Sequence, residues 1–335
     1  MNKPLIAVAD SVFPSLEPTE RVLSAINGTV RLAAEPTADA ILAVAQQADA
    51  LMVTFATLDG NLIAGLKRCR VIGRFGIGVD NIDVDVATRA GIQVCFVPDY
   101  CLDEVSDHAV ALMMSLARKV SYSDRLVRAG RWEGKAAAPL RRLRGRTMGL
   151  MGLGKIPQTL VPKAQAFGLN VIAHDPYIDP QVAADLGVEL VDFSGLLANS
   201  DYLSIHAPLT SDTHHLFNAE AFRQMKPDAL LINTARGPLV DEGALAAALD
   251  NEQLAGAALD VLNDEPPPPD CPLLNRDNVI LTAHIAYYSE DALVDLQIKA
   301  AQDVASVLQG RTPTYPVNSL PLPGPANSRR NESPE

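Results

Sequence analysis

The stretch Gly152-Leu153-Gly154-Lys155-Ile156-Pro157 decides the fold of this chain. It follows the apolar run 147–151 and opens a stretch of helical composition that ends near Phe167. In a turn from a strand into a helix, the first glycine permits the tight turn and the second lets the backbone approach a pyrophosphate. The free N–H groups and the dipole of the new helix favour negative charge. The sequence therefore predicts a strand, turn and helix that bind a phosphate group.

A carboxylate follows the next apolar run of the chain. Residues 170–174 end at Asp175, slightly beyond the roughly 20 residues expected for the acid that accepts the ribose hydroxyls of a dinucleotide. A Gly-x-Gly turn alone is a weak signal, because a connection without a ligand shows the same pattern. The carboxylate of Asp175 at this distance favours a dinucleotide-binding turn over a connection without a ligand. Because a carboxylate repels a 2′-phosphate and no arginine follows Asp175 directly, we expect NAD rather than NADP.

Two prolines depart from the usual pattern of such a turn. Pro157 stands where a third glycine is common, and it costs little in a first helical turn, where its N–H would have no partner. Pro162 lies deeper and removes a helical hydrogen bond. We therefore expect the helix to kink or to be shortened there.

Length and composition limit the number of domains, the possible partners and the location of the protein. A chain of 335 residues exceeds the usual single-core size of about 250–300 residues and should form two domains. A net charge of -12 argues against nucleic acid or an anionic membrane as the main partner. The four cysteines are scattered without a Cys-x-x-Cys pair, so we expect no metal and no disulfide framework. The start at Met1 has no cleavable apolar core, and no run approaches about 18 apolar residues, which predicts a cytoplasmic protein.

Short apolar runs alternate with helix-like stretches from Leu5 to Val97, which predicts a parallel sheet. One long helix is expected from about Asp103 to Arg128, with His108 as a structural residue, and another from Ser289 to Gln309. The final segment is rich in Pro, Asn and Ser, which predicts a disordered tail.

Further apolar runs end at polar residues, where the ligand crevice of an open parallel sheet lies. Three of these endings supply Arg236, Glu265 and His284.

Several motifs occur in a fixed order between about Val53 and Asn318. They are residues 74–83, 103–108, the glycine turn, 233–237, 239–242, 258–261 with 265–266, 282–284 and 287–290. Together they resemble the D-isomer-specific 2-hydroxyacid dehydrogenase family. Within it, the chain resembles the branch of the C-terminal-binding proteins and the enzymes similar to phosphoglycerate dehydrogenase.

The resemblance implies an α/β fold of two Rossmann-like domains with parallel sheets. In such a fold a doubly wound NAD-binding domain, residues 101–286, is inserted into a smaller flavodoxin-like substrate domain, residues 1–100 and 287–316. The disordered tail is then 317–335. The resemblance also implies a homodimer formed through the nucleotide domains, and a small 2-keto or 2-hydroxy acid as substrate.

By this resemblance, Arg236, Glu265 and His284 form a catalytic triad. Reduction of a 2-keto acid needs a proton for the carbonyl oxygen as hydride reaches the carbon, and an imidazole, with an unperturbed pKa of about 6.5, is a suitable donor. Glu265 would orient the imidazole, and Arg236 would bind the substrate carboxylate and polarise the carbonyl.

Other positions of the family transfer to single residues of this chain. The substrate is expected at Arg74, the backbone of Gly76 and Ile77, and Tyr287, which stands where the C-terminal-binding proteins have a tryptophan. The cofactor contacts implied by the resemblance and the turn are Gly152, Gly154, Lys155, Ile156, Asp175, Ala207, Pro208, Thr213, Thr234 and Asp260.

Two alternatives remain open at the level of sequence. The C-terminal-binding proteins act as transcriptional corepressors, so the chain is alternatively an NAD-sensing module that binds other proteins. The same fold also oxidises formate or phosphite, but the family members that act on formate pair a glutamine with the histidine. Glu265 therefore disfavours formate.

Overall fold

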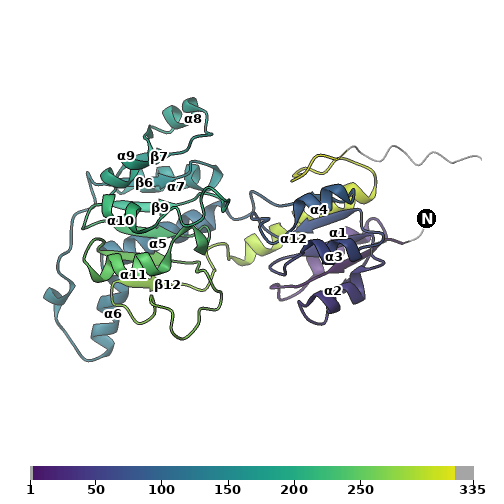
Figure 1. Ribbon diagram of the computed structural model, residues 1–335, viewed down its shortest axis with the longest axis horizontal. Helices are drawn as coiled ribbons and strands as arrows, with labels where there is room; N and C mark the ends of the chain where they lie inside the picture. Colours follow the sequence, from purple (N-terminus) through teal and green to yellow (C-terminus); the bar gives the residue numbers. More distant parts are fainter. Residues whose placement is uncertain (1–2, 321–335) are drawn as a thin grey trace, which may run out of the picture. The chain divides into compact units, whose positions relative to one another are not determined.

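The computed structural model describes residues 3–320, which divide into two compact units. The first contains residues 3–100 and 289–320, and the second contains Cys101–Tyr288 (Figure 1). Residues 287 and 288, expected in the substrate domain from the sequence, belong to the second unit. No helix among residues 3–320 is both long and apolar enough to cross a membrane.

The first unit is built on a parallel sheet of five strands in the order β2-β1-β3-β4-β5. Strands β1, β3, β4 and β5 are almost completely buried, as expected for a sheet with helices on both faces. Helices α2, α3 and α4 bury their apolar side chains on one face, and α12 packs against α1 and β4. The elements are β1 (Leu5–Val8), α1 (Glu17–Ser24), β2 (Thr29–Leu32), α2 (Ala38–Ala45), β3 (Ala50–Val53), α3 (Gly60–Gly65), β4 (Val71–Arg74), α4 (Val84–Arg89), β5 (Gln93–Cys95) and α12 (Glu290–Leu308).

The segment after α12 returns to the sheet and is held there. The side chain of Asn318 is 8% exposed and accepts hydrogen bonds from the backbone N–H of Val94 (2.7 Å) and from Gln93 Nε2 (2.8 Å). Val317 donates its N–H to the Val94 carbonyl at 2.8 Å. The expectation of disorder is therefore wrong for residues 317 and 318, because their polar groups find partners on β5. Residues 321–335 of the predicted tail lie outside the described residues.

The second unit is built on a parallel sheet of seven strands in the order β12-β11-β10-β9-β6-β7-β8. Helices α9, α10 and α11 cover one face, and α5 and α7 cover the other, which gives three layers (Figure 1). The elements are α5 (Leu102–Ala117), α6 (Val120–Arg128), η1 (Gly134–Ala137), β6 (Thr147–Met151), α7 (Lys155–Ala166), β7 (Asn170–His174), α8 (Pro180–Asp185), β8 (Glu189–Leu190), α9 (Phe193–Asn199), β9 (Tyr202–Ile205), α10 (Ala219–Gln224), β10 (Leu230–Asn233), η2 (Gly237–Leu239), α11 (Glu242–Asp250), β11 (Gly256–Leu259) and β12 (Val279–Leu281).

The single helix expected from 103 to 128 is wrong, because the structure has two helices there. Helix α5 ends at Ala117, and Lys119 adopts a left-handed conformation with φ of 51° before α6 begins. Ser115 and Ser121, on either side of this break, are joined by a hydrogen bond of 2.7 Å between their hydroxyls. The helical spacing of apolar residues does not reveal one left-handed residue, since it changes the chain direction without changing the pattern.

The sequence predicts a kink or an end of the helix at Pro162, but helix α7 is not shortened there. It runs without interruption from Lys155 to Ala166. Leu160, Val161 and Ala164 are completely buried against the sheet and α5. This burial offsets the cost of an interior proline, which is about 3 kcal/mol.

Candidate active site

The three expected catalytic side chains follow three neighbouring strands of the second unit. Arg236 follows β10, Glu265 follows β11 and His284 follows β12. Strands β10, β11 and β12 are adjacent and parallel, so their carboxyl ends meet at one edge of the sheet.

His284 and Glu265 form a direct pair. His284 Nδ1 lies 2.7 Å from Glu265 Oε2, and the other carboxylate oxygen accepts the N–H of Leu262 at 3.1 Å. The glutamate is thus held at one oxygen by the backbone and holds the imidazole with the other. With Nδ1–H donated to Glu265, Nε2 is the ring nitrogen that faces away from the carboxylate. Tyr287 places its ring 6.1 Å from that of His284, edge to face, as an aromatic wall beside the imidazole.

A buried carboxylate fixes the loop that carries His284. Asp260 is 1% exposed, and its oxygens accept hydrogen bonds from Thr282 Oγ1 (2.5 Å) and from the N–H groups of Ile285 (3.0 Å) and Ala286 (2.9 Å). Its carbonyl accepts the N–H of His284 at 2.8 Å, and His284 itself has a positive φ of 51°. Asp260, expected at the nicotinamide from the resemblance, therefore positions the loop that carries His284.

His108 joins this network from helix α5. Its Nε2 lies 3.0 Å from Thr282 Oγ1 and 3.5 Å from Asp260 Oδ1. The interpretation of His108 as a structural residue missed this connection to the loop of His284. The sequence alone offers no signal for it, because the two residues are 176 positions apart.

The backbone around Arg236 is fixed by small and buried polar residues. Asn233 is completely buried, donates to the Arg236 carbonyl (2.8 Å) and accepts the N–H of Ala235 (3.0 Å). A Cβ at Gly237 would lie 2.1 Å from the backbone of Leu262, so only glycine fits where these two segments approach. Both residues stand in the motif at 233–237, but their roles needed the structure.

The glycine turn between β6 and α7 has the geometry of an anion cradle. Gly152 has a φ of +95°, and a Cβ there would lie 3.1 Å from the His206 carbonyl. A Cβ at Gly154 would meet no heavy atom within 4 Å, so the surface over this residue is open. Lys155 and Ile156 form the first turn of α7, and Gly154 at its N-cap has no side chain that could cap the backbone N–H groups there.

Asp175 lies at the end of β7 beside this turn. One oxygen accepts the N–H of Leu153 at 2.8 Å and the other accepts the N–H of Tyr177 at 2.9 Å. The carboxylate is thus tied to the cradle by the backbone.

The remaining expected cofactor contacts line the same edge of the sheet. Ala207 and Pro208 follow β9, where Thr213 closes the loop by donating its hydroxyl to the Pro208 carbonyl at 2.7 Å. The buried Oγ1 of Thr234 has no hydrogen-bond partner within residues 3–320. An orphaned hydroxyl at the same edge of the sheet as the glycine turn fits a dinucleotide, whose ribose and amide groups can satisfy it. His206, which precedes Ala207, was not expected as a site residue. Burial lowers its pKa to about 4, so the ring is neutral near pH 7.

The expected substrate loop belongs to the first unit. Arg74 ends β4, is 8% exposed and donates from Nη1 to the Phe75 carbonyl at 2.5 Å. Gly76 has a φ of +144°, and a Cβ there would lie 1.2 Å from Arg74 Nη1, so glycine is required for this position of the guanidinium. The N–H of Gly76 donates to the Arg74 carbonyl at 3.0 Å.

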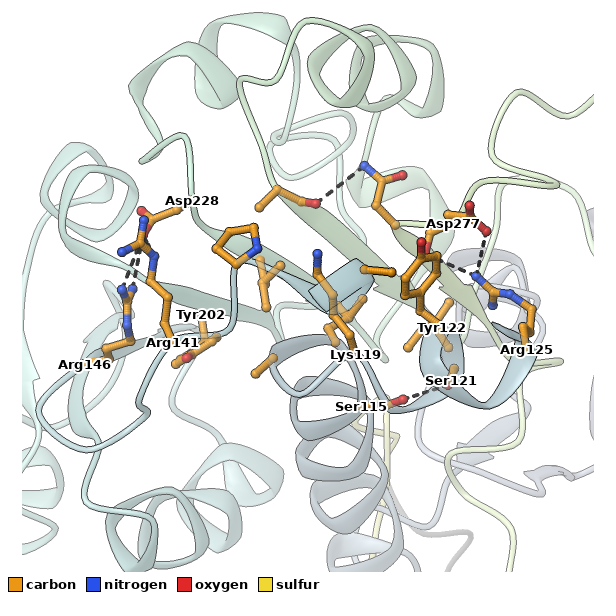
Figure 2. Close-up of a pocket in the computed structure, with 18 residues that line it drawn as sticks. Ser115, Lys119, Ser121, Tyr122, Arg125, Arg141, Arg146, Tyr202, Asp228 and Asp277 are labelled. Atoms are coloured by element: carbon orange, nitrogen blue, oxygen red, sulfur yellow. Dashed lines mark hydrogen bonds and ion pairs between the residues drawn. The ribbon is translucent and has the colours of Figure 1, made fainter. Parts of the chain in front are cut away.

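A separate pocket of about 350 Å³ lies at the amino ends of the strands in the second unit. Its wall includes Tyr202 and Leu230, which begin β9 and β10, so it lies at the edge opposite to His284. Figure 2 shows Arg141 and Arg146 on Asp228 at one end, Arg125 on Asp277 at the other, and Lys119 between them. The charged side chains of this pocket are largely paired with one another.

No group of three or more His, Cys, Asp or Glu side chains in the described part of the chain is arranged to hold a metal ion. All four cysteines are free thiols.

Comparison with known proteins identifies the family. Residues 110–286 match the NAD-binding domain of the D-isomer-specific 2-hydroxyacid dehydrogenases. D-3-phosphoglycerate dehydrogenase of Archaeoglobus fulgidus is 41% identical over 76% of this chain and 48% of its own length. Glyoxylate reductase of Korarchaeum cryptofilum is 36% identical over 92% of this chain and 95% of its own. The chain spans about half the length of the phosphoglycerate dehydrogenases that it matches.

A solved structure agrees with this assignment. D-lactate dehydrogenase from Aquifex aeolicus, in complex with NAD and lactic acid, has a TM-score of 0.84 and 26% identity, covering 91% of this chain and 96% of that one. The α/β fold with parallel sheets is therefore confirmed. The chain belongs to the D-isomer-specific 2-hydroxyacid dehydrogenase family, and residues 110–286 are its NAD-binding domain.

Proposed function

We propose that this protein interconverts a small 2-keto acid and its D-2-hydroxy acid with NAD(H). The observation that carries the proposal is the His284–Glu265 pair of 2.7 Å, which lies with Arg236 on three adjacent strand ends of the sheet that also bears the glycine cradle. Family membership and the named relatives support an oxidoreductase.

The chemistry assigns a role to each of the three side chains. The nicotinamide, when bound, supplies or accepts the hydride. Arg236 binds the substrate carboxylate and polarises the carbonyl, which orients the keto group. His284 donates its Nε2 proton to the carbonyl oxygen during reduction and accepts the hydroxyl proton during oxidation. Glu265 holds Nδ1 so that the ring keeps the required tautomer and orientation.

The other expected residues contribute binding. By the family resemblance, Arg74 and the backbone of Gly76 and Ile77 would bind a carboxylate, and Tyr287 would lie beside the imidazole of His284. The glycine turn with Lys155 and Ile156 would hold the pyrophosphate, while Thr234 and Asp260 would meet the nicotinamide half. Asp175 would accept the ribose hydroxyls, and its charge would favour NAD over NADP.

The direct test is NADH oxidation by the purified protein with a panel of 2-keto acids. We expect His284→Ala to lower kcat by about 100- to 10,000-fold and Glu265→Gln to lower it less, because the imidazole remains. Both variants should still bind NADH, which a fluorescence titration checks and which also controls for folding. Tight NADH binding without reduction of any keto acid would refute the enzyme and favour the NAD-sensing module.

We also propose that two copies of the chain associate through the second unit. Helix α6 has no buried residue, and Val120 and Val127 on it are 57% and 49% exposed. Trp132, which follows α6, is 89% exposed. Tyr122 and Arg125 of the same helix line the pocket (Figure 2). Exposed apolar side chains on such a helix are typical of a protein interface. The cytoplasmic location expected from the sequence stays a prediction.

A further inference from the structure

The pocket at the amino ends of the strands lies within the second unit and away from the expected catalytic residues. One side of it is formed where four adjacent strands, β9 to β12, begin, whereas Arg236, Glu265 and His284 follow the opposite ends of β10, β11 and β12. Helix α6 and residues between 136 and 141 contribute to its other sides (Figure 2). Its volume of about 350 Å³ is within the range of roughly 300 to 1,000 Å³ in which proteins bind small molecules.

Four cations stand in the wall of this pocket, and three of them are neutralised by carboxylates. These three are arginines, each with an acidic oxygen at 3.4 Å or less. The pairs are Arg125 with Asp277 (3.0 Å), Arg141 with Asp228 (3.1 Å), and Arg146 with Asp228 (3.4 Å) and with Asp201 (2.9 Å). Both carboxylates of the wall are therefore engaged, so the pocket offers no free negative charge to a cationic ligand.

The fourth cation, Lys119, contacts no carboxylate of residues 3–320. Its Nζ donates to the carbonyl of Ala138 at 3.2 Å, which is the contact of its ammonium group in this part of the chain. Figure 2 shows Lys119 between the two ends of the pocket at which the arginines are paired. An ammonium group has three donors, so one carbonyl leaves two of them for a ligand. An anion can thus gain a charge-assisted hydrogen bond here without breaking an existing ion pair.

The backbone of Lys119 is strained, and glycine would fit it better. With φ of 51° and ψ of 39°, the residue is left-handed at the position after α5 where glycine is most common. Residues with a Cβ are disfavoured in this conformation, and such strain is found especially at active sites and ligand sites. Ser115 and Ser121 hold the turn through a hydrogen bond of 2.7 Å between their hydroxyls. The turn therefore fixes the point from which the lysine side chain enters the pocket.

The surroundings of Lys119 decide which kind of anion fits. Apolar surface in the wall comes from Leu230, Ile280, and the rings of Tyr122 and Tyr202. One unpaired cation balances one negative charge, whereas a phosphate ester carries about −1.5 to −2 near pH 7. A carboxylate attached to an apolar body matches both the single charge and the apolar wall.

We propose that this pocket is a second ligand site, which binds a small monocarboxylate with an apolar body through Lys119. The site is built from the second unit alone and lies at the edge of the sheet opposite to the catalytic residues. It is also distinct from the proposed dimer contact, because Val120, Val127 and Trp132 do not line the pocket. The inference goes beyond the proposed function and does not depend on it.

The test is a ligand-observed NMR titration of the purified protein with 3-phenylpropionate, which gives Kd. The neutral 3-phenylpropionamide has nearly the same shape and should bind at least tenfold more weakly. Lys119→Met keeps an apolar stem without the charge and should also weaken binding of 3-phenylpropionate at least tenfold. Lys135→Met removes an exposed charge from the neighbouring η1, outside the wall of the pocket, and should change Kd less than twofold.

Two further variants separate this site from folding and from the catalytic edge. Lys119→Gly fits the left-handed backbone, so it should melt no lower than the natural protein and still lose binding at least tenfold. Arg236→Leu should retain binding, because the probe is not held at the expected substrate arginine.

Several results would overturn the proposal. An unchanged Kd in both Lys119 variants would show that the lysine does not hold the probe, and loss of binding in Arg236→Leu would place the probe at the catalytic edge. Binding to a monomeric Trp132→Glu variant but not to the natural protein would show that a second copy covers the pocket. Absence of saturable binding to all of these proteins would refute a carboxylate site of this kind.

Discussion

At the scale of single residues, a substitution of His108 tests whether the loop that carries His284 depends on its contact with helix α5. His108→Leu removes the hydrogen bond to Thr282 and leaves that hydroxyl and Asp260 without their partner on α5. One lost hydrogen bond of about 1 kcal/mol in the positioning of His284 corresponds to a decrease in kcat of about fivefold to tenfold. Steady-state kinetics would measure it, with His108→Gln as the matched control that keeps a polar partner. Equal kcat in the leucine variant and the natural protein would contradict this role.

The same scale shows what the sequence could and could not predict about the site. Arg236, Glu265 and His284 were predicted as site residues because each follows an apolar strand and stands in a motif of the family. Their roles stay predictions until activity is measured. Gly237 and His108 support the site through contacts with residues that are distant in the chain, Leu262 and Thr282. Periodicity and spacing report on neighbours in sequence, so such contacts require the folded structure.

At the scale of elements, α6 carries a prediction about assembly. A helix with no buried residue is unstable alone, because most helices in proteins are stabilised by packing an apolar face. If two copies pack through α6 and the segment after it, Trp132→Glu should convert the dimer into a monomer, since a buried charge without a partner opposes association. Light scattering coupled to size-exclusion chromatography measures the mass. Tyr177→Glu, at a side chain that is 92% exposed on the same unit, is the control. A natural protein that is monomeric at micromolar concentration would refute the interface.

Composition predicted where the buried strands lie. It did not predict a helix boundary that depends on the backbone conformation of a single residue. The apolar runs of the strands were visible because parallel strands are buried on both faces. The break between α5 and α6 was missed because Lys119 adopts a left-handed conformation that its residue type does not announce. Asn318 was placed in a disordered tail on composition, although its side chain completes the hydrogen bonding of β5.

At the scale of the whole molecule, length and motif order predicted two α/β units. The dependence of stability on pH is not predicted in this way, because it is decided by the burial of single titratable groups. Burial lowers the pKa of His206 to about 4, whereas the unfolded chain has an ordinary histidine pKa of about 6.5. Between these values the unfolded state binds more protons than the folded state. The free energy of unfolding therefore falls as pH falls from about 6.5 to about 4, by at most about 3 kcal/mol from this residue.

His206→Gln isolates that contribution from the many carboxylates that also titrate in acid. The glutamine keeps a polar group near Ser204, which lies 2.8 Å from the histidine ring, but it cannot take up a proton. We expect the natural protein to lose more thermal stability than the variant between pH 7 and pH 5. Above pH 7, we expect the stability of the two proteins to change with pH in the same way. Melting followed by circular dichroism at each pH measures this difference. Parallel pH profiles of the two proteins would show that His206 is protonated equally in the folded and unfolded states, against the effect of its burial.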